Sequence, residues 1–540
     1  MKPALTNALA WLARPVDAAS LGLFRILFGL CMLYSYLDYI RNGGLHGEMI
    51  APRFHFRYPG LEWVSDPSPG LVVGAIVGFS LLLALGLLTR LASLGFLVSY
   101  VWWFLSDAAY YNNHYYLICL LGGLFLVTNP ERWGSVDSRI WPRPAAIPAW
   151  QLYIFRFQLI VVYFYGGLAK LNADWLRGIP VKYWLAERAA SRGLDFLAWP
   201  ATTTLVTTAG ILIDLTAPFL LLWRRTRWLG LALMVGFHLA NSYLFSIGIF
   251  PWLMLAALVL FLEPDAPRRW LRRPPLRLPE PRPLPALVVA CLLVYAVVQL
   301  LLPLRHLVRG QDVAWDEDGH LWSWRMKLRD KNGAVGFVLL DRGQLSVPHV
   351  HADLTAYQVR RIQGRPDLIR QYARHLAEKT GCQVLIWTWT SLNRRPCQTL
   401  LDQEGRLFPF LDLQFPPPGP ANLVLAIDQR QERGVEGFYH VDLLDAQNHP
   451  VGSRRVQRDS SATRQFIELS GLPAGRFRLL VLALSPGGLV LTHSVADCEL
   501  QSGDNRFKIS QARFIPGPPL GLISGAGSSS SGPNRPQAAP

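Results

Sequence analysis

Charged residues are scarce in this sequence of 540 residues, and their scarcity points to its class. Only 17% of the residues are Asp, Glu, Lys or Arg, whereas 51% are hydrophobic and 12% are aromatic. Apolar runs of roughly 20 residues crowd into the part of the chain before residue 304, and such runs are long enough to cross the hydrocarbon core of a bilayer. The composition therefore excludes an ordinary soluble enzyme. It predicts an integral membrane protein with membrane lipid as a partner.

These runs predict a polytopic α-helical bundle with about nine membrane spans. The eighth run is short enough to be partly re-entrant. The first run is long and no small-residue cleavage site follows it, so we expect it to stay in the mature protein rather than act as a signal peptide. The candidate spans are residues 20–40, 70–89, 91–109, 114–128, 149–169, 202–223, 228–246, 249–262 and 285–303.

Acidic residues are too few to balance the basic ones, which leaves a formal net charge of +16. The positive-inside rule assigns the arginine-rich loops to the cytoplasm. With nine spans, the N-terminus is then cytoplasmic and everything after residue 304 is extracytoplasmic, and the short loops fit a bacterial inner membrane. Because no basic patch with interleaved aromatics remains, we expect no nucleic-acid partner. The loop arginines are Arg132, Arg139, Arg143, Arg224, Arg225, Arg227, Arg268, Arg269, Arg272, Arg273, Arg277 and Arg282.

Cysteine is also rare, with 6 in the whole chain. Cys31, Cys119 and Cys291 fall in apolar spans, where a thiol usually acts as a small hydrophobe. Cys382 and Cys397 flank a strand-like segment outside the membrane, where they form either a disulfide or two free thiols. The sequence contains no CxxC pair and no local His–Cys cluster, so it predicts no metal site.

The chain after the last span predicts two extracytoplasmic domains. A mixed α/β lobe is expected at 304–418, with a helix over 365–381 that a proline begins and a glycine ends. Short strands separated by turn signals then predict an antiparallel β-sandwich at 421–514. The residues 515–540 are rich in Pro, Gly and Ser and have little to bury, so we expect them to be disordered.

Ionisable residues at membrane depth are costly and need a partner or a task. Four of them lie within predicted spans and are interpreted as structural ion pairs that bring the helices together. They are Arg25, Asp107, Arg156 and Asp214.

Lys170 ends the apolar run "VVYFYGGLAK" and allows two interpretations. It can snorkel to the membrane surface, or it can act as a neutral base because burial disfavours the charged amine. His114 and His238 lie on the same predicted side of the membrane, in or beside uncharged turns that can line a cavity. Such histidines are often packing residues, but convergence of all three side chains would favour catalysis. The second interpretation also requires Asp174, one turn further on, to point elsewhere.

Several blocks of the chain resemble the vitamin K-dependent γ-carboxylases and their bacterial relatives, whose membrane module is called the horizontally transferred transmembrane (HTTM) domain. The likeness extends in pieces over about residues 10 to 410 and is specific in combination. The blocks are "VDAASLGLFRILFGL" (16–30), "NNHYYL" (112–117), "YFYGGLAKLNADWLRG" (163–178), "HLANSYLFSIGIFPWLMLA" (238–256), "WSWRMKLRDK" (322–331), "PDLIRQYARHLA" (366–377) and "WTSLNRRPCQTLLD" (389–402).

The resemblance implies an enzyme that oxygenates reduced vitamin K, a naphthoquinol, to its epoxide with dioxygen. The strong base formed in that step removes a proton from the γ-carbon of a peptidyl glutamate, and carbon dioxide traps the carbanion without a metal. The implied partners are an exported peptide or protein that bears glutamate and a quinone reductase that recycles the cofactor.

The resemblance also implies roles for individual residues. It places the catalytic base at Lys170 and the functionally important histidines at His114 and His238. In the same blocks, cofactor-binding positions are expected at Asn113, Trp175, Asn241 and Ser242, and substrate-binding positions at Trp324, Asn393 and Arg394.

Three positions depart from the pattern of the animal enzymes, and all three lie in the part that binds the peptide. Arg365 stands where a histidine is expected, Phe337 where a tyrosine is expected, and Arg325 where an aspartate is expected. The alternatives are therefore a quinol epoxidase without glutamate carboxylation and a non-catalytic module that binds lipid or quinone. A transporter is disfavoured because the sequence has neither repeated halves nor paired broken helices.

Overall fold

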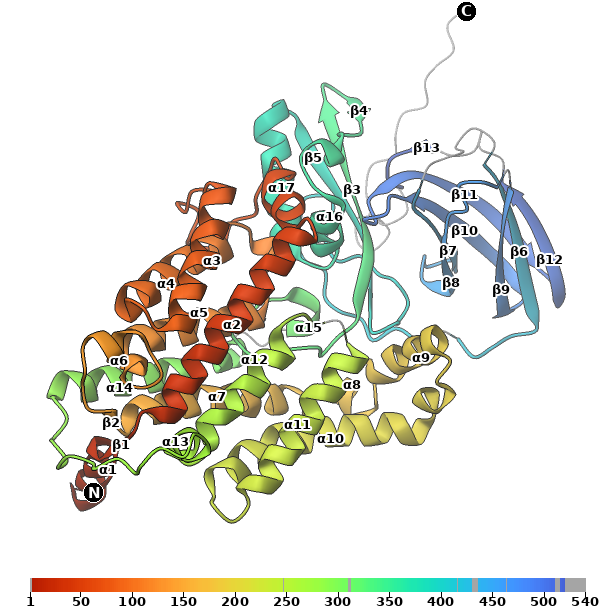
Figure 1. The fold of residues 1–540 in the computed structure, drawn as a ribbon. Coiled ribbons are helices and arrows are strands. Elements are labelled where there is room, and N and C mark those ends of the chain that lie inside the picture. Colours follow the sequence, from red (N-terminus) through yellow and green to blue (C-terminus); the bar gives the residue numbers. More distant parts are fainter. Residues whose placement is uncertain are drawn as a thin grey trace, which may run out of the picture. The chain divides into compact units, whose positions relative to one another are not determined.

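Two units make up the computed structural model, which describes residues 2–245, 247–308, 312–414, 416–429, 436–462, 464–509 and 515–519. Met1–Arg329 form a helical unit and Asp330–Pro540 form a β-rich unit (Figure 1). The predicted order of a helical N-terminal region and a later β-rich region is thereby confirmed. This division into two units follows from the contacts within each unit. The domain boundaries expected at 303/304 and at 418–421 stay predictions.

A helix occupies each of the nine predicted membrane positions, but within the described residues only four segments are long and apolar enough to cross a bilayer. Nine spans are therefore not established. The four are α2 (Ala19–Arg41), α7 (Trp150–Ala169), α10 (Pro200–Leu222) and Ala286–Val308, which joins α14 (Ala286–Leu301) to η6 (Leu302–Val308). The shorter apolar helices are α3 (Pro69–Leu85), α4 (Thr89–Leu105), α5 (Asn113–Val127) and Phe250–Phe261, which joins α12 (Phe250–Ala257) to η5 (Leu258–Phe261). The remaining predicted position, the seventh of the nine, holds α11 (Arg227–Leu244).

Local signals explain why some helices are shorter than the apolar runs. The chain turns into the left-handed region at Gly86, with φ at 66°, so α3 stops at Leu85 although the run continues to residue 89. Phe250–Phe261 would be about 18 Å long as a regular helix, against a hydrocarbon core of about 30 Å.

The helices of the first unit pack mainly against their neighbours in sequence. α2, α3, α4 and α5 follow one another side by side, while α7 lies beside α10 and α10 beside α11 (Figure 1). α12 then returns to pack on α2. Four buried phenylalanines from α2, α5 and α7 meet edge to face at the centre, and they are Phe24, Phe28, Phe125 and Phe155.

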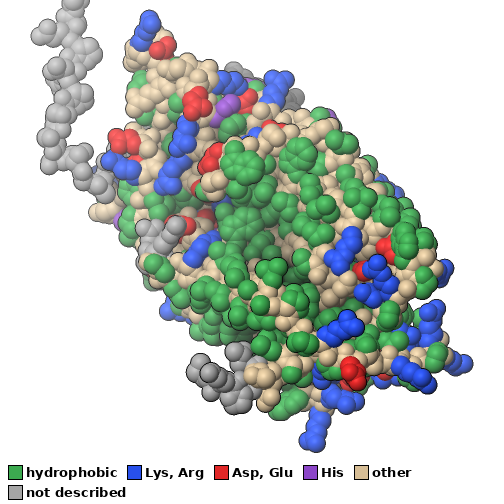
Figure 2. Space-filling model, turned by 90° about the vertical axis from the view of Figure 1, so that its left-hand side faces the viewer, with side chains coloured by type: hydrophobic (Ala, Val, Ile, Leu, Met, Phe, Trp, Pro, Cys, Tyr) green, Lys and Arg blue, Asp and Glu red, His purple; other side chains and the backbone are tan. Residues whose placement is uncertain are grey.

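Large apolar side chains remain on the outside of this helical unit. In α14, Leu287, Leu293 and Val294 are each more than half exposed. Figure 2 shows hydrophobic side chains gathered over much of the face that it displays. Because soluble proteins rarely leave such extended apolar surface in water, these helices indicate a membrane protein.

The second unit begins with the predicted α/β elements. A three-stranded antiparallel sheet has the order β4–β3–β5, formed by β3 (Lys331–Asp341), β4 (Gln344–Ser346) and β5 (Gln383–Leu392). Along the chain, α16 (Ala356–Ile362) and α17 (Pro366–Thr380) connect β4 to β5. As predicted, α17 starts at a proline and ends at Gly381, whose φ is 71°.

Two further sheets form the sandwich. One has the order β13–β11–β10–β7–β8 and the other has the order β12–β6–β9. The strands are β6 (Ala421–Asp428), β7 (Phe438–Leu444), β8 (Pro450–Gln457), β9 (Arg464–Leu472), β10 (Gly475–Leu484), β11 (Val490–Leu500), β12 (Gly503–Ile509) and β13 (Ile515–Pro516). Alternate side chains of both sheets, such as Leu425, Val441 and Val481, share one buried core.

The five-stranded sheet is covered on its other face as well. Leu480, Leu482 and Leu484 of β10 pack with Trp387 and Trp389 of the α/β elements in a second buried cluster. This explains why β10 reads "LLVLAL" without alternation, since a strand covered on both faces has no polar side.

Two expectations for this region are corrected. The sandwich is not wholly antiparallel, because β12 pairs with β6 in parallel. Ile515–Pro516, placed in a disordered tail, pair with β11, and Gly517 O accepts a hydrogen bond from His493 Nδ1 at 2.7 Å. Residues 520–540 of the predicted tail lie outside the described residues.

Candidate functional site

The end of α7 places Lys170 against α10. Gly167 allows this approach, because a Cβ there would lie 2.8 Å from the Leu215 side chain and 3.1 Å from Asp214 Cβ. Gly210, one turn before Asp214, leaves the α10 surface flat beneath the Lys170 methylene groups. Small residues at these positions therefore bring the two helices close enough for a direct contact between their polar side chains.

Lys170 and Asp214 form a buried ion pair. Lys170 Nζ lies 2.5 Å from Asp214 Oδ2 and donates a second hydrogen bond to Gly166 O at 3.2 Å. The two residues are 8% and 4% exposed, and Nζ lies 5.5 Å from the centre of the Trp175 ring. The lysine is thus enclosed rather than extended to the membrane surface, so it does not snorkel.

Asp214, and not Asp174, is the carboxylate beside Lys170. The chain leaves α7 after Ala169, and the Asn172 side chain caps a separate short helix, α8 (Ala173–Leu176), which carries Asp174. The interpretation of Lys170 as a neutral base required Asp174 to point elsewhere, and the carboxylate that pairs with Lys170 comes from α10 instead.

His238 lies deep in the bundle on α11 and is 1% exposed. Its Nε2 is 2.7 Å from the hydroxyl of Tyr163 on α7. Its Nδ1 is buried without a hydrogen-bond partner among the described residues. One ring nitrogen is therefore fixed by tyrosine, while the other remains available to a bound molecule.

His114 and His238 lie on either side of one aromatic ring. The imidazole of His114 stacks on Phe250, with ring centres 3.7 Å apart and an interplanar angle of 10°. His238 meets the same ring edge to face at 6.2 Å. Three elements, α5, α11 and the start of α12, thus bring the two predicted histidines together.

Lys170 lies further along the same side of α7. Tyr163 and Lys170 are seven residues apart, which is close to two helical turns, or about 10 Å. The Asp214 carboxylate is near enough to Tyr163 to interact with it electrostatically. The Lys170–Asp214 pair and the Tyr163–His238 pair therefore lie about two helical turns apart on the same side of α7.

The predicted cofactor-binding residues have different environments. Asn113 uses its side chain internally, accepting from the Tyr111 hydroxyl at 2.8 Å and donating to Arg325 O at 3.2 Å. Trp175 donates from Nε1 to the backbone oxygen of Thr207 at 3.2 Å. Asn241 and Ser242 are half-buried at the end of α11, and the described residues offer their side chains no hydrogen-bond partner.

The predicted substrate-binding residues fall in both units. Trp324 belongs to the helical unit, is 1% exposed and stacks on Tyr116 with ring centres 5.0 Å apart. Asn393 and Arg394 belong to the β-rich unit, and both have positive φ. Asn393 Oδ1 accepts from Asp330 N at 2.8 Å, and Arg394 Nε donates to Asp330 Oδ2 at 2.8 Å. These two residues therefore shape the start of β3.

Most of the structural ion pairs expected within the membrane are wrong. Arg156 donates to the backbone oxygens of Leu260 and Leu262 at 2.6 and 3.0 Å. Arg25 donates to Gly134 O at 2.7 Å, and in the described part of the chain it forms no ion pair. Backbone carbonyls accept hydrogen bonds from both arginines, although Arg25 Nε and Nη1 are buried without a partner among the described residues.

Asp107 acts mainly as a cap. Its carboxylate accepts from the backbone N–H of Ala109 at 2.8 Å and lies 3.4 Å from His55 Nδ1. Asp214 pairs with a cation of another helix, and that cation is Lys170.

The positions that depart from the animal pattern are structurally satisfied. Arg365 forms a two-point contact with Asp367, from Nε to Oδ1 at 3.0 Å and from its terminal nitrogen to Oδ2 at 2.7 Å. Burial raises the pKa of the Asp367 carboxyl, but Arg365 and local N–H groups lower it by more, so the pKa lies below its usual value. Phe337 is buried against Tyr372.

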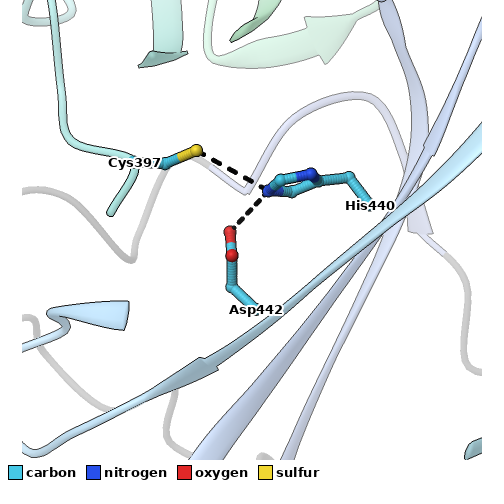
Figure 3. Close-up of side chains that lie close together, drawn as sticks. All are labelled: Cys397, His440 and Asp442. Carbon is cyan, nitrogen blue, oxygen red and sulfur yellow. Dashed lines mark hydrogen bonds and ion pairs between the residues drawn. The ribbon is translucent and has the colours of Figure 1, made fainter. Parts of the chain in front are cut away.

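Cys382 and Cys397 are both free thiols, as are the four other cysteines. A polar cluster that the sequence did not reveal lies at Cys397, whose Sγ is 3.8 Å from His440 Nε2 (Figure 3). The sequence has no local His–Cys cluster, and this one forms because the fold joins residues that are 43 positions apart.

Two cavities of the molecule lie away from these residues. A hollow of about 290 Å³ is lined by Thr89, Arg90, Asp137 and Trp141, at the start of α4. A second cavity, of about 500 Å³, lies on the β-rich unit beside Arg476 and Arg478. Lys170, His114 and His238 line neither of these two cavities, and their side chains are held mainly by contacts between helices.

Two family models match consecutive parts of the chain. Residues 13–266 match the family model of the HTTM domain. Residues 284–410 match the model of the vitamin K-dependent gamma-carboxylase lumenal domain. No solved structure matches the chain. The two matches follow each other along the chain and together cover the helical bundle and the α/β elements, and on this evidence the chain belongs to the vitamin K-dependent gamma-carboxylase family.

Proposed function

We propose that this chain is a membrane enzyme that oxygenates a reduced naphthoquinone to its epoxide and carboxylates glutamate on an exported peptide. In this proposal the N-terminus is cytoplasmic, the β-rich unit is extracytoplasmic and the host membrane is a bacterial inner membrane. The observation that carries the proposal is the buried contact of 2.5 Å between Lys170 Nζ and Asp214 Oδ2, on the same side of α7 as the Tyr163–His238 pair.

The Lys170–Asp214 pair supplies a proton acceptor without requiring a free charge in the membrane. The ammonium–carboxylate pair and the neutral amine–acid pair differ only in the position of one proton. Because desolvation penalises both charges of the ionic form, the apolar surroundings lower the free-energy cost of transferring that proton across the 2.5 Å contact. The resulting amine at Lys170 has the lone pair that a general base needs to accept a proton from a weakly acidic phenol.

The remaining residues position the ring and move the proton. Tyr163 holds the orientation of the His238 ring through Nε2, and Nδ1 is left to bond a quinol oxygen. The rings of Phe250 and Trp175 offer apolar faces against which a planar naphthoquinol packs. Asn241 and Ser242 lie at the end of the same helix as His238 and add polar groups at the extracytoplasmic side.

The surroundings also fit a molecule with an isoprenoid tail. Leu168 of α7 and Leu212 of α10 are 39% and 55% exposed, so apolar surface that would face lipid begins next to the lysine. The buried, unpartnered Nδ1 of His238 is a further sign that a polar ligand completes the site. When bound, the quinol supplies with dioxygen the strong base that removes the γ-proton of glutamate.

The direct test is an assay on the purified chain in lipid nanodiscs with reduced vitamin K, dioxygen, labelled bicarbonate and a glutamate-rich peptide. The proposal predicts quinone epoxide together with peptide-bound label. Epoxide without label would reduce the function to a quinol epoxidase, and the changes at Arg365, Phe337 and Arg325 would then account for the missing peptide reaction. Absence of both products would contradict the proposal.

A non-catalytic quinone-binding module is favoured by one observation. Lys170 Nζ already has two hydrogen-bond acceptors and an aromatic neighbour, as a purely structural lysine would. The two functions differ in their response to Lys170→Ala. A binding module would retain quinol affinity and show no epoxide in either form, whereas the enzyme would lose epoxide formation with little change in affinity.

A further inference from the structure

A sulfur, a nitrogen and a carboxylate oxygen converge inside the β-rich unit. Cys397 Sγ lies 3.8 Å from His440 Nε2, and His440 Nε2 lies 2.9 Å from Asp442 Oδ2. One donor atom from each of the three side chains falls within 4.8 Å of the others (Figure 3). None of these residues belongs to the site on α7.

The fold explains how these residues meet. His440 and Asp442 are two positions apart on β7, so both side chains point to the same face of the sheet. That face is covered by Trp387 and Trp389, whereas the intervening Val441 points into the core between the two sheets. Cys397 comes from the loop after β5. The cluster thus joins the α/β elements to the five-stranded sheet.

The geometry differs from that of a nucleophilic Cys–His–Asp triad. In a triad the carboxylate bonds one imidazole nitrogen and the thiol faces the other nitrogen. Here both Cys397 Sγ and Asp442 Oδ2 face the same atom, His440 Nε2. The three residues therefore cannot relay a proton through the imidazole ring. Their donor atoms instead converge on one position, as the ligands of a metal ion do.

The carboxylate is oriented and incompletely satisfied. Asp442 is 0% exposed, and its Oδ2 accepts a hydrogen bond from Trp389 Nε1 at 2.5 Å. Its Oδ1 is buried without a hydrogen-bond partner among the described residues. A buried carboxylate oxygen without a partner is costly, and a cation bound in the cluster would compensate that cost.

We propose that Cys397, His440 and Asp442 bind a divalent transition-metal ion of the zinc class. Sulfur, imidazole nitrogen and carboxylate oxygen are the donors that Zn²⁺ takes in proteins. With metal–sulfur and metal–nitrogen distances of about 2.3 and 2.0 Å, the two donors of a tetrahedral site lie about 3.5 Å apart. The observed separation of 3.8 Å between Sγ and Nε2 is close to this value. A water molecule would take the fourth position.

A neighbouring cation limits the charge of the site. Arg455 lies opposite His440 in the pairing of β7 with β8, and its guanidinium lies 4.6 Å from the centre of the Phe438 ring. Arg455 is also close enough to Cys397 to interact with it electrostatically. Before a metal binds, the Asp442 carboxylate offsets the charge of this guanidinium, and a metal that binds here has to displace the proton of the Cys397 thiol.

The test uses the full chain in detergent, stripped with a chelator and then exposed to Zn²⁺ or Co²⁺ alone. Metal analysis after desalting should give about one ion per chain, and Co²⁺ should produce the near-ultraviolet absorption of a thiolate–cobalt bond. Cys397→Ser and His440→Gln should each weaken binding by more than about 100-fold, which exceeds the usual loss for an outer-shell partner. Trp389→Phe should cost about 10-fold, because Asp442 loses the hydrogen bond that orients it.

Cys498→Ser is the matched control, since Cys498 is an equally buried cysteine of the same unit in the other hydrophobic core. It should bind metal as the unchanged chain does. Circular dichroism separates loss of metal from loss of fold, and Asp442→Asn provides a second ligand variant if Cys397→Ser fails to fold. Retention of the metal in Cys397→Ser, or no bound metal in the unchanged chain, would overturn the proposal.

Discussion

Two ion pairs of nearly equal length lie in very different parts of the molecule. Lys170 and Asp214 meet at 2.5 Å inside the helical unit, and Arg365 and Asp367 meet at 2.7 Å in the β-rich unit. Both side chains of the first pair are at most 10% exposed, whereas the Asp367 side chain is 36% exposed. Water can replace the partner in the second pair but not in the first. The two ion pairs therefore contribute differently to the free energy of unfolding although their geometry is similar, and they can have different roles.

The largest expected effect follows from removing the amine of the buried pair. Lys170→Ala should lower quinol epoxidation by about 10² to 10⁴-fold, the usual contribution of a general base. Epoxide can be measured by chromatography under saturating quinol. Lys182→Ala is the matched control, because Lys182 lies in α9 (Val181–Arg192) against the Tyr183 ring and has no part in the site. Equal losses in the two variants would contradict the role of Lys170.

Removing only the carboxylate tests how strongly the surroundings penalise an unpaired charge. Asp214→Asn should destabilise the protein by about 3–5 kcal/mol, because it leaves the Lys170 ammonium buried without a counter-ion. Thermal unfolding in detergent gives the measurement.

The double variant Lys170→Met with Asp214→Leu separates stability from chemistry. It should recover most of the lost stability, since two apolar side chains replace the pair, but it should recover no epoxidation. Activity in this variant would show that the pair has only a structural role.

Sequence reasoning singled out Lys170 and His238 for a physical reason, and their catalytic roles stay predictions. A lysine that ends a run of apolar residues is conspicuous because a charge there is expensive, and the same applies to His238 in α11. The partners were harder to predict. Asp214 is 44 positions from Lys170, and only the close approach of α10 at Gly167 identifies it. The ion pairs predicted for Arg25 and Arg156 were wrong because backbone carbonyls distant in the sequence accept their hydrogen bonds.

In the β-rich unit the strands and α17 followed from local patterns, but the Cys397 cluster did not. Cysteine, histidine and aspartate are unremarkable in a domain that contacts water, and the two strand residues are separated from Cys397 by 43 and 45 positions along the chain. The parallel pairing of β12 with β6 was missed for a similar reason, since pairing direction depends on tertiary contacts. The number of membrane spans was also hard to predict from the sequence, because C-caps such as Gly86 end helices within apolar runs.

A smaller effect is expected when the helix approach is disturbed without changing a polar group. Gly167→Ala places a methyl group 2.8 Å from the Leu215 side chain, so α10 has to move. Overpacking of this kind typically costs about 1–3 kcal/mol, and the Lys170–Asp214 contact should lengthen. Epoxidation should fall with little change in quinol affinity. The control is Gly74→Ala in α3, where the added methyl group meets no neighbour within 4 Å.

The hydroxyl that fixes His238 should matter less than the ion pair. Tyr163→Phe leaves His238 Nε2 without its partner at 2.7 Å, at a cost of about 1–2 kcal/mol. Thermal unfolding and epoxidation should both decrease modestly. An unchanged epoxidation rate in a protein of reduced stability would assign Tyr163 a packing role only.

The smallest effect belongs to the pair that contacts water, and it should depend on pH. The folded-state pKa of Asp367 is lowered, so its stabilisation is present above the unfolded pKa of about 3.9 and is lost as pH falls through the folded value. Asp367→Asn should therefore cost about 0.5–1 kcal/mol at pH 7, a value reduced for solvent exposure. The difference in unfolding free energy should vanish near pH 2. A cost that persists there would contradict the electrostatic explanation.

Chemical rescue tests the central claim most directly, namely that the amine at position 170 accepts the proton of the quinol. Lys170→Ala in nanodiscs would be given reduced vitamin K, dioxygen and a series of small primary amines of increasing basicity. The account predicts that epoxide formation returns in proportion to amine concentration and rises with amine basicity, while Lys182→Ala shows no such dependence. A folded Lys170→Ala protein that forms epoxide at the unchanged rate without added amine would contradict it.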